Sequence, residues 1–91
     1  MEKNENHVQV AVVTTSGSWP REGFEKIPAH QKVKIFLEKA IRKLNIVTTQ
    51  QWAVKVGGKV IDPEKNYIEQ GLFGDVLIDY GPIEGGGGSR S

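Results

Sequence analysis

The chain contains no cysteine among its 91 residues. This absence excludes disulfides, thiolate nucleophiles, cysteine-based zinc sites and iron–sulfur clusters. A protein without cysteine also suits a reducing compartment, so we expect a cytoplasmic location.

The sequence has little net charge and no long apolar run. Twelve basic and eleven acidic residues leave a net charge of +1, which gives no strong attraction to nucleic acid or to a membrane surface. No apolar segment approaches the roughly 18–20 residues that span a bilayer. Residues 1–6 are polar and lack the apolar core of a signal peptide. We therefore expect one globular domain with no nucleic-acid or membrane partner.

The first part of the domain is predicted to form a hairpin. Residues 8–15 are rich in β-branched side chains, which predicts a strand with its valines on one face. Residues 16–23 contain Gly, Ser and Pro and are predicted to form a loop. Residues 24–27 are then predicted to form a short return strand. Phe24 and Ile27 lie three positions apart, so they cannot both face the core without a bulge, and the register stays open.

Residues 31–44 show the clearest helical pattern. The apolar side chains recur at helical spacing and make one stripe, which consists of Val33, Phe36, Leu37, Ala40, Ile41 and Leu44. The helix start is poorly marked, because Ala29 and His30 are weak N-caps. Asn45 suits a C-terminal cap, and Ile35 falls outside the stripe.

The second half of the domain is predicted to contain three more strands and one helical turn. The strands are expected at residues 51–56, 59–61 and 75–80, and the helical turn at residues 67–71. A helix with a single apolar stripe needs a partner surface, which predicts a mixed sheet with the helix on one face. The element order allows the first and last strands to lie side by side in the centre. This is the α+β arrangement called the β-grasp.

The chain resembles ubiquitin and its relatives over about residues 8–88. The resemblance rests on four short features in order, which are Ile27-Pro28 before Lys32-Val33-Lys34, Gln50-Gln51 before the third strand, Gly58-Lys59-Val60 after it, and Asn66-Tyr67-Ile68 before the last strand. Glycines just beyond the last strand complete the pattern. The overall identity is low, so the chain is similar to ubiquitin-like proteins, bacterial ones included, and is not ubiquitin itself.

This resemblance implies a protein modifier that other enzymes act on, and not an enzyme. We expect a lead-in at residues 1–6, a folded domain at residues 7–82 and a tail at residues 83–91. The tail carries four consecutive glycines, which are Gly85, Gly86, Gly87 and Gly88. Ser89-Arg90-Ser91 follow them, so the resemblance implies a precursor that a processing peptidase cuts after Gly88 or an earlier glycine.

The resemblance also implies the remaining partners. An activating enzyme would adenylate the exposed glycine carboxylate, and a conjugating enzyme would pass it to an amine of a target protein, often that of a lysine. A carboxylate is a poor electrophile at neutral pH, and adenylation supplies a good leaving group. Glycine suits this chemistry because it has no Cβ to obstruct a narrow channel or the attacking nucleophile.

Two other functions stay open at this point. Tails rich in Gly and Ser are also typical of flexible linkers or of added sequences, in which case the domain would be a non-covalent interaction module. Sulfur carriers of the same fold use a thiocarboxylate on a terminal glycine. They typically end in a bare Gly-Gly, and the Ser-Arg-Ser extension counts mildly against them.

Trp19, Ala53, Lys55 and Lys59 are the candidate partner contacts. The third strand is predicted to show Ala53 and Lys55 on the open side of the sheet, where ubiquitin carries an apolar patch. Trp19 is either an exposed anchor for a partner or a side chain folded over the sheet edge or helix end, and we favour the second. Lys55 and Lys59 are also candidate acceptors for chain formation.

No group of residues predicts catalysis, a cofactor or a metal site. No sequence feature brings His7 and His30 together, so both are expected to be ordinary surface histidines. Ser16 and Ser18 have no paired base in the sequence. The segment Gly57-Gly58-Lys59 lacks the spacing of a phosphate-binding loop, and a hairpin turn explains it.

Overall fold

The computed structural model describes residues 7–47 and 51–82. The elements in these residues are β1 (His7–Thr14), β2 (Gly17–Trp19), β3 (Glu25–Pro28), α1 (Val33–Leu44), β4 (Trp52–Val56), β5 (Lys59–Val60), the 3-10 turn η2 (Ile68–Gln70) and β6 (Asp75–Pro82). The predicted lead-in at residues 1–6 and the predicted tail at residues 83–91 lie outside the described residues.

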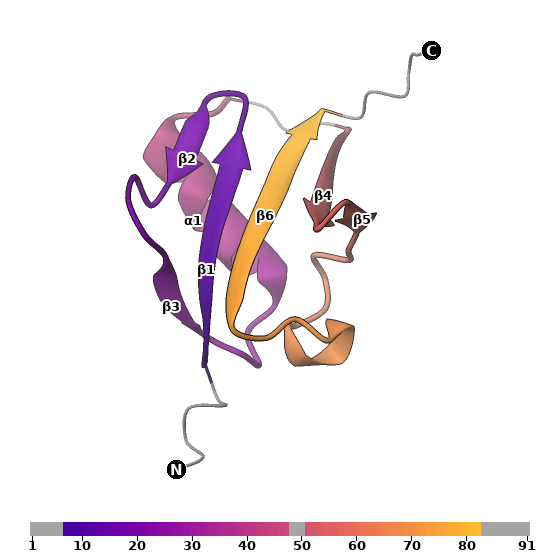
Figure 1. Cartoon of the computed structure of the whole chain (residues 1–91). Helices are drawn as coiled ribbons and strands as arrows, with labels where there is room; N and C mark the ends of the chain where they lie inside the picture. Colours follow the sequence, from indigo (N-terminus) through magenta and orange to yellow (C-terminus); the bar gives the residue numbers. More distant parts are fainter. Residues whose placement is uncertain (1–6, 48–50, 83–91) are drawn as a thin grey trace.

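The first and last strands lie side by side at the centre of the sheet (Figure 1). β1 and β6 run parallel, with Val10 opposite Val76 and Val12 opposite Ile78. The strand order is β2-β1-β6-β4-β5, and β3 pairs with the first half of β1. This mixed sheet confirms the predicted β-grasp arrangement.

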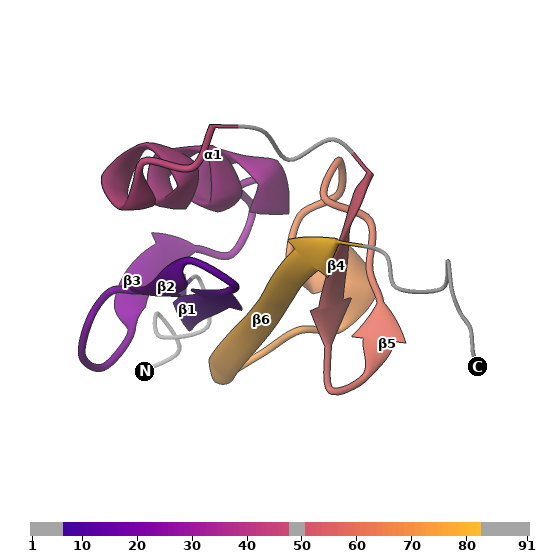
Figure 2. The ribbon, with the colours of Figure 1, turned by 90° about the horizontal axis from the view of Figure 1, so that it is seen from above.

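Helix α1 covers one face of the sheet (Figure 2). Side chains alternate between the two faces of a strand, so every second residue of β1 and β6 points toward the helix. The buried core consists of Val8, Val10, Val12, Ile27, Ala29, Val33, Phe36, Leu37, Ala40, Val54, Tyr67, Val76 and Ile78. Burial of each large apolar side chain contributes about 1.5–3 kcal/mol before conformational entropy is counted.

The predicted helix stripe is buried along most of its length. Val33, Phe36, Leu37 and Ala40 are buried, whereas the last two stripe residues, Ile41 and Leu44, are only half-buried. The helix therefore packs most tightly through its first two turns.

The start of α1 is fixed by a turn that lies far along the chain. The N-cap residue, Lys32, makes no side-chain capping bond. Instead, the amide of Val33 donates to the Lys65 carbonyl at 3.0 Å, and that of Lys34 donates to the Pro63 carbonyl at 2.9 Å. These long-range bonds satisfy amides that have no acceptor within the helix. They explain why the sequence around residue 31 carries no start signal.

The helix end follows the local sequence. Asn45 adopts a left-handed conformation with φ of 57°, which confirms the predicted cap. Its amide donates to the Arg42 carbonyl at 3.3 Å, and the Ile46 amide donates to the Ile41 carbonyl at 3.0 Å. These bonds close the last turn.

The sheet edge beside β1 differs from the prediction of a single return strand. β2 lies within the predicted loop and pairs with the second half of β1, with Val12 opposite Trp19. β3 pairs with the first half, with Val10 opposite Glu25. Residues 20–24 form the loop between β2 and β3. Ala11 is the residue of β1 that lies between the two pairings.

Proline explains the interruption of this edge. Pro20 follows β2 directly and has no amide to donate to a ladder, so pairing stops after Trp19. Phe24, which we placed in the return strand, lies in the loop and is 41% exposed. Ile27 faces the core, which settles the register that the sequence left open.

Other boundaries shift by one or two residues. α1 begins at Val33, two residues later than predicted. β6 continues through Gly81 and Pro82, which we expected to end it, because Ala53 and Trp52 of β4 pair with them. The predicted helical turn is the 3-10 turn η2, closed by Gly71 in a left-handed conformation.

Tyr67 is fully buried and carries a hydroxyl without a hydrogen-bond partner among the described residues. Its backbone holds it in place, because its amide donates to the Ala29 carbonyl at 3.2 Å and its carbonyl accepts from the Leu72 amide at 2.9 Å. Burial raises the pKa of the Tyr67 phenol above its usual value near 10, so the group stays neutral. A buried hydroxyl without a partner opposes folding.

We therefore expect Tyr67→Phe to leave stability unchanged or to raise the free energy of unfolding by up to about 1 kcal/mol, because it removes an unsatisfied polar atom. Urea unfolding followed by circular dichroism measures the change. The control Tyr67→Ala removes the ring as well and should cost about 3 kcal/mol or more. A loss above 1 kcal/mol in the phenylalanine variant would show that the hydroxyl has a stabilising partner.

Candidate functional site

The last described strand, the central strand β6, ends at Pro82, three residues before the first of the four glycines. The final residues of β6, Gly81 and Pro82, stand opposite Ala53 and Trp52 of β4. Trp52 in turn contacts the ring of Tyr80 edge-on, with ring centroids 5.0 Å apart. The point at which the chain leaves the sheet is thus held on its β4 side by pairing and by aromatic packing.

A shallow hollow of about 210 Å³ lies beside this exit point. The hollow, which we call the exit hollow, is lined by Thr15, Ala53, Lys55, Asp79, Gly81 and Pro82. Three parts of the chain thus meet here, which are the β1–β2 turn, β4 and β6. Two of the four predicted partner contacts, Ala53 and Lys55, belong to it.

The exit hollow carries one charge of each sign on the open face of the sheet. Lys55 stands directly opposite Asp79 across β4 and β6, and both side chains are exposed. Neighbouring Val54 points into the core instead, as the predicted alternation of β4 requires. Leu77 precedes Asp79 by two positions in β6, and it is 53% exposed on the same face.

The other two predicted contacts lie elsewhere. Lys59 is exposed in β5 opposite Val56, and it does not line the exit hollow. Trp19 packs toward the helix, where its ring centroid lies 5.5 Å from that of Phe36. The Lys39 ammonium lies 5.2 Å from the Trp19 ring centroid, and the same ammonium pairs with Glu25 at 2.9 Å.

We favoured a Trp19 ring that folds over the sheet edge or the helix end, and the ring packs on Phe36 in the first half of α1. The side chain remains half-buried, so part of the ring stays accessible. A contact with a partner through Trp19, Ala53, Lys55 or Lys59 stays a prediction.

Sequence reasoning missed four residues of the exit hollow, which are Thr15, Asp79, Gly81 and Pro82. The alternation of β6 places Asp79 on the open face. However, only the register between β4 and β6 sets it opposite Lys55, and the sequence does not encode that register locally. The predicted processing residues, Gly85, Gly86, Gly87 and Gly88, lie outside the described residues.

The described parts of the chain contain no cluster of three or more His, Cys, Asp or Glu side chains that could hold a metal ion. Within the same ranges, no helix has the length and apolar character needed to cross a membrane.

Comparison with known proteins gives information on the fold alone. No protein-family model matches the chain, and no curated protein sequence matches it. Solved structures do match it. A de novo design based on ubiquitin superimposes with a TM-score of 0.63 at 16% identity, covering 82% of this chain and 87% of the design.

A natural domain gives the same result. The N-terminal ubiquitin-like domain of the 4931431F19Rik protein superimposes with a TM-score of 0.58 at 15% identity, covering 100% of this chain and 90% of that domain. The fold is the ubiquitin-like β-grasp. A ubiquitin-like domain of EccD5 from Mycobacterium xenopi is also similar, at a TM-score of 0.49 and 12% identity, covering 86% of this chain and 98% of that one.

Lys55 and Asp79 allow a test of the register between β4 and β6. Lys55→Glu places two negative charges directly opposite each other, so we expect the free energy of unfolding to fall by about 0.5 kcal/mol at low salt. The loss should shrink at about 1 M salt, where charges are screened within roughly 3 Å. Urea unfolding at both salt concentrations measures it. The control Lys59→Glu faces the uncharged Val56, and an equal loss there would contradict the assigned pairing.

Trp19 is expected to stabilise the fold whether or not a partner binds it. Trp19→Ala removes the ring that packs on Phe36 and below Lys39, and should lower the free energy of unfolding by about 2 kcal/mol. Thermal and urea unfolding measure the change. The matched control Phe73→Ala truncates a ring that is 64% exposed, and should cost about 0.5 kcal/mol or less. Equal effects would mean that the ring of Trp19 does not contribute through packing.

Proposed function

We propose that the chain is the precursor of a ubiquitin-like protein modifier. A peptidase cuts it after Gly88 or an earlier glycine, and the new carboxylate is joined to an amine of a target protein. The observation that carries this proposal is the position of the glycines. They follow, within three residues, a central strand that ends at the margin of a ubiquitin-like β-grasp sheet.

The chemistry explains why glycine would stand at this place. An activating enzyme lets the carboxylate oxygen attack the α-phosphorus of ATP, and pyrophosphate leaves. A thiol or an amine then attacks the acyl carbon of the adenylate, and AMP leaves. Since glycine has no Cβ, the thiol or amine reaches the acyl carbon without obstruction. In this scheme the chain is the substrate, and the activating enzyme, the conjugating enzyme and the peptidase supply the catalysis.

The folded body contributes recognition to this proposal. An enzyme that reaches the glycines approaches the end of β6, and the exit hollow is the surface that borders this end. At the place where the resemblance to ubiquitin implies an apolar patch, this chain carries Lys55 and Asp79 on neighbouring strands. We therefore propose partners that read a charged surface at this position instead of an apolar patch.

The deciding experiment follows the fate of the C-terminus. The full chain, with an N-terminal tag, is expressed in its source cells and recovered under denaturing conditions for mass spectrometry. We expect loss of Ser89-Arg90-Ser91 and the appearance of lysine residues of other proteins that carry a glycine remnant. A variant that ends at residue 83 lacks every glycine of the tail and serves as the control, which should form no such adduct. An unchanged C-terminus with no lysine adduct would rule the proposal out.

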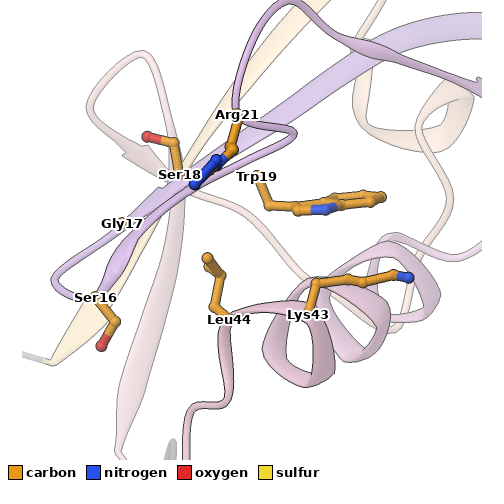
Figure 3. Close-up of a pocket in the computed structure, with 7 residues that line it drawn as sticks. All are labelled: Ser16, Gly17, Ser18, Trp19, Arg21, Lys43 and Leu44. Carbon is orange, nitrogen blue, oxygen red and sulfur yellow. The ribbon is translucent and has the colours of Figure 1, made fainter.

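A second candidate function is that of a non-covalent interaction module. It is favoured by a second hollow, of about 730 Å³, between β2 and the C-terminal end of α1 (Figure 3), which shares no lining residue with the exit hollow. We call it the β2–α1 groove, and its lining residues are Ser16, Gly17, Ser18, Trp19, Arg21, Lys43 and Leu44. The two functions differ in their dependence on the tail. Deletion of residues 85–91 leaves partner binding intact for an interaction module and abolishes every adduct for a modifier.

A further inference from the structure

The charged side chains are divided unevenly between the two described parts of the chain. Residues 7–47 contain seven lysine and arginine residues and three glutamates, which gives a net charge of +4 with the histidines counted as neutral. Residues 51–82 contain three lysines and five carboxylates, which gives a net charge of −2. The small net charge of the whole chain therefore combines two parts of opposite sign.

The fold places these two parts on opposite sides of the molecule. Figures 1 and 2 show β2 and β3 on one side of the central β1–β6 pair, and β4 and β5 on the other. The C-terminal end of α1 lies on the side of β2, whereas η2 lies on the side of β5. The separation of charge along the sequence is thus also a separation in space.

The positive charge is concentrated around β2, β3 and the end of α1. Arg21, Lys26 and Lys43 are exposed there, and we call the surface that they form the basic side. The ion pairs of the described residues, Lys39–Glu25 and Lys34–Glu64, do not include these three cations. Their charges are therefore available to a partner.

The negative charge is concentrated in the segment from the end of β5 to η2. Asp62, Glu64 and Glu69 are exposed in this segment, and we call the surface that they form the acidic side. Asp62 Oδ1 accepts from the Glu64 amide at 2.9 Å, and Glu69 Oε1 accepts from the Asn66 amide at 3.0 Å. These bonds hold two of the carboxylates in fixed positions, which lowers the entropy cost of a contact.

Each side also exposes apolar surface near its charges. Val60 lies two residues before Asp62 and is 70% exposed, and Ile68 is exposed directly before Glu69. On the basic side, Phe24 is exposed in the loop that contains Arg21. Apolar side chains close to complementary charges are what a weak protein–protein contact requires.

From this arrangement we infer that the chain associates with further copies of itself in head-to-tail order. The basic side of one copy lies against the acidic side of the next. A second copy is the partner because both complementary surfaces are present on one chain. Since the two sides differ, the contact is heterologous, and each added copy leaves one free side of each sign for further growth. The contact is weak and depends on salt, because the charges are exposed.

This association is separate from the proposed modifier function. Neither the basic side nor the acidic side includes a residue that lines the exit hollow, and the glycines take no part in the contact. A variant that ends at residue 83 should therefore associate as the full chain does. Failure of the glycine chemistry would leave this inference intact, and the reverse also holds.

The test measures the mass of the full chain by sedimentation at about 1 mM protein, where contacts of millimolar affinity are populated. We expect a mean mass above that of the monomer at low salt, and the monomer at about 1 M salt. Arg21→Glu/Lys43→Glu reverses the basic side and should be monomeric. Asp62→Asn/Glu64→Lys/Glu69→Gln removes the acidic side, keeps the amide-accepting oxygens of residues 62 and 69, and should also be monomeric.

Mixing these two variants is the decisive measurement. One variant keeps its acidic side and the other keeps its basic side, so an equimolar mixture should form dimers that do not grow further. Two controls make the same changes in net charge on the opposite sides. Lys55→Glu/Lys59→Glu leaves the basic side intact, Glu22→Lys/Glu38→Lys leaves the acidic side intact, and both should associate at least as strongly as the original chain.

Several results of this experiment would overturn the inference. A monomeric original chain at low salt, or a monomeric mixture of the two variants, would show that the sides do not bind each other. Dimers of either variant alone would indicate a two-fold contact instead of a head-to-tail one. Equal losses in the controls would show that net charge alone governs association. Circular dichroism and thermal unfolding confirm that each variant is folded.

Discussion

The parallel pairing of β1 with β6 is the constraint on which the rest of the structure depends. It joins strands that lie more than sixty residues apart in the sequence, from Gln9 opposite Asp75 to Val13 opposite Asp79. The pairing aligns Val10 with Val76 and Val12 with Ile78, and these side chains form the floor on which α1 packs. It also brings the end of β6 next to the β1–β2 turn, which is why Thr15 borders the exit hollow.

The two ends of helix α1 are held by different interactions, and this difference determines where the β2–α1 groove forms. Its start is tied to residues 63–65 by backbone hydrogen bonds, and its middle is buried. Its end closes on itself through Asn45, and its last stripe residue, Leu44, is only half-buried. β2 is too short to cover this last turn, so the β2–α1 groove forms where the edge of the sheet and the end of the helix fail to fill the space between them.

The two hollows offer different chemistry at one end of the same sheet. The exit hollow combines a lysine and an aspartate with small residues beside the end of β6. The β2–α1 groove combines two cations with Trp19 and Leu44. The two hollows share no lining residue.

Local sequence by itself determined the elements that local physics controls. The alternation of β1, β4 and β6, the apolar stripe of α1 and the cap at Asn45 were all predictable, because each depends on residues within one or two turns. The order of these elements was sufficient to predict the β-grasp.

Only the tertiary structure decided the features that depend on pairing across the chain. The division of the return strand into β2 and β3 follows from competition for one edge of β1, and the helix start follows from acceptors about thirty residues away. The register between β4 and β6 placed Asp79 opposite Lys55. The end of α1 then left Leu44 beside Gly17. Such distances are fixed by packing, because the hydrophobic pattern specifies which face of an element is buried and not which residues of two elements meet.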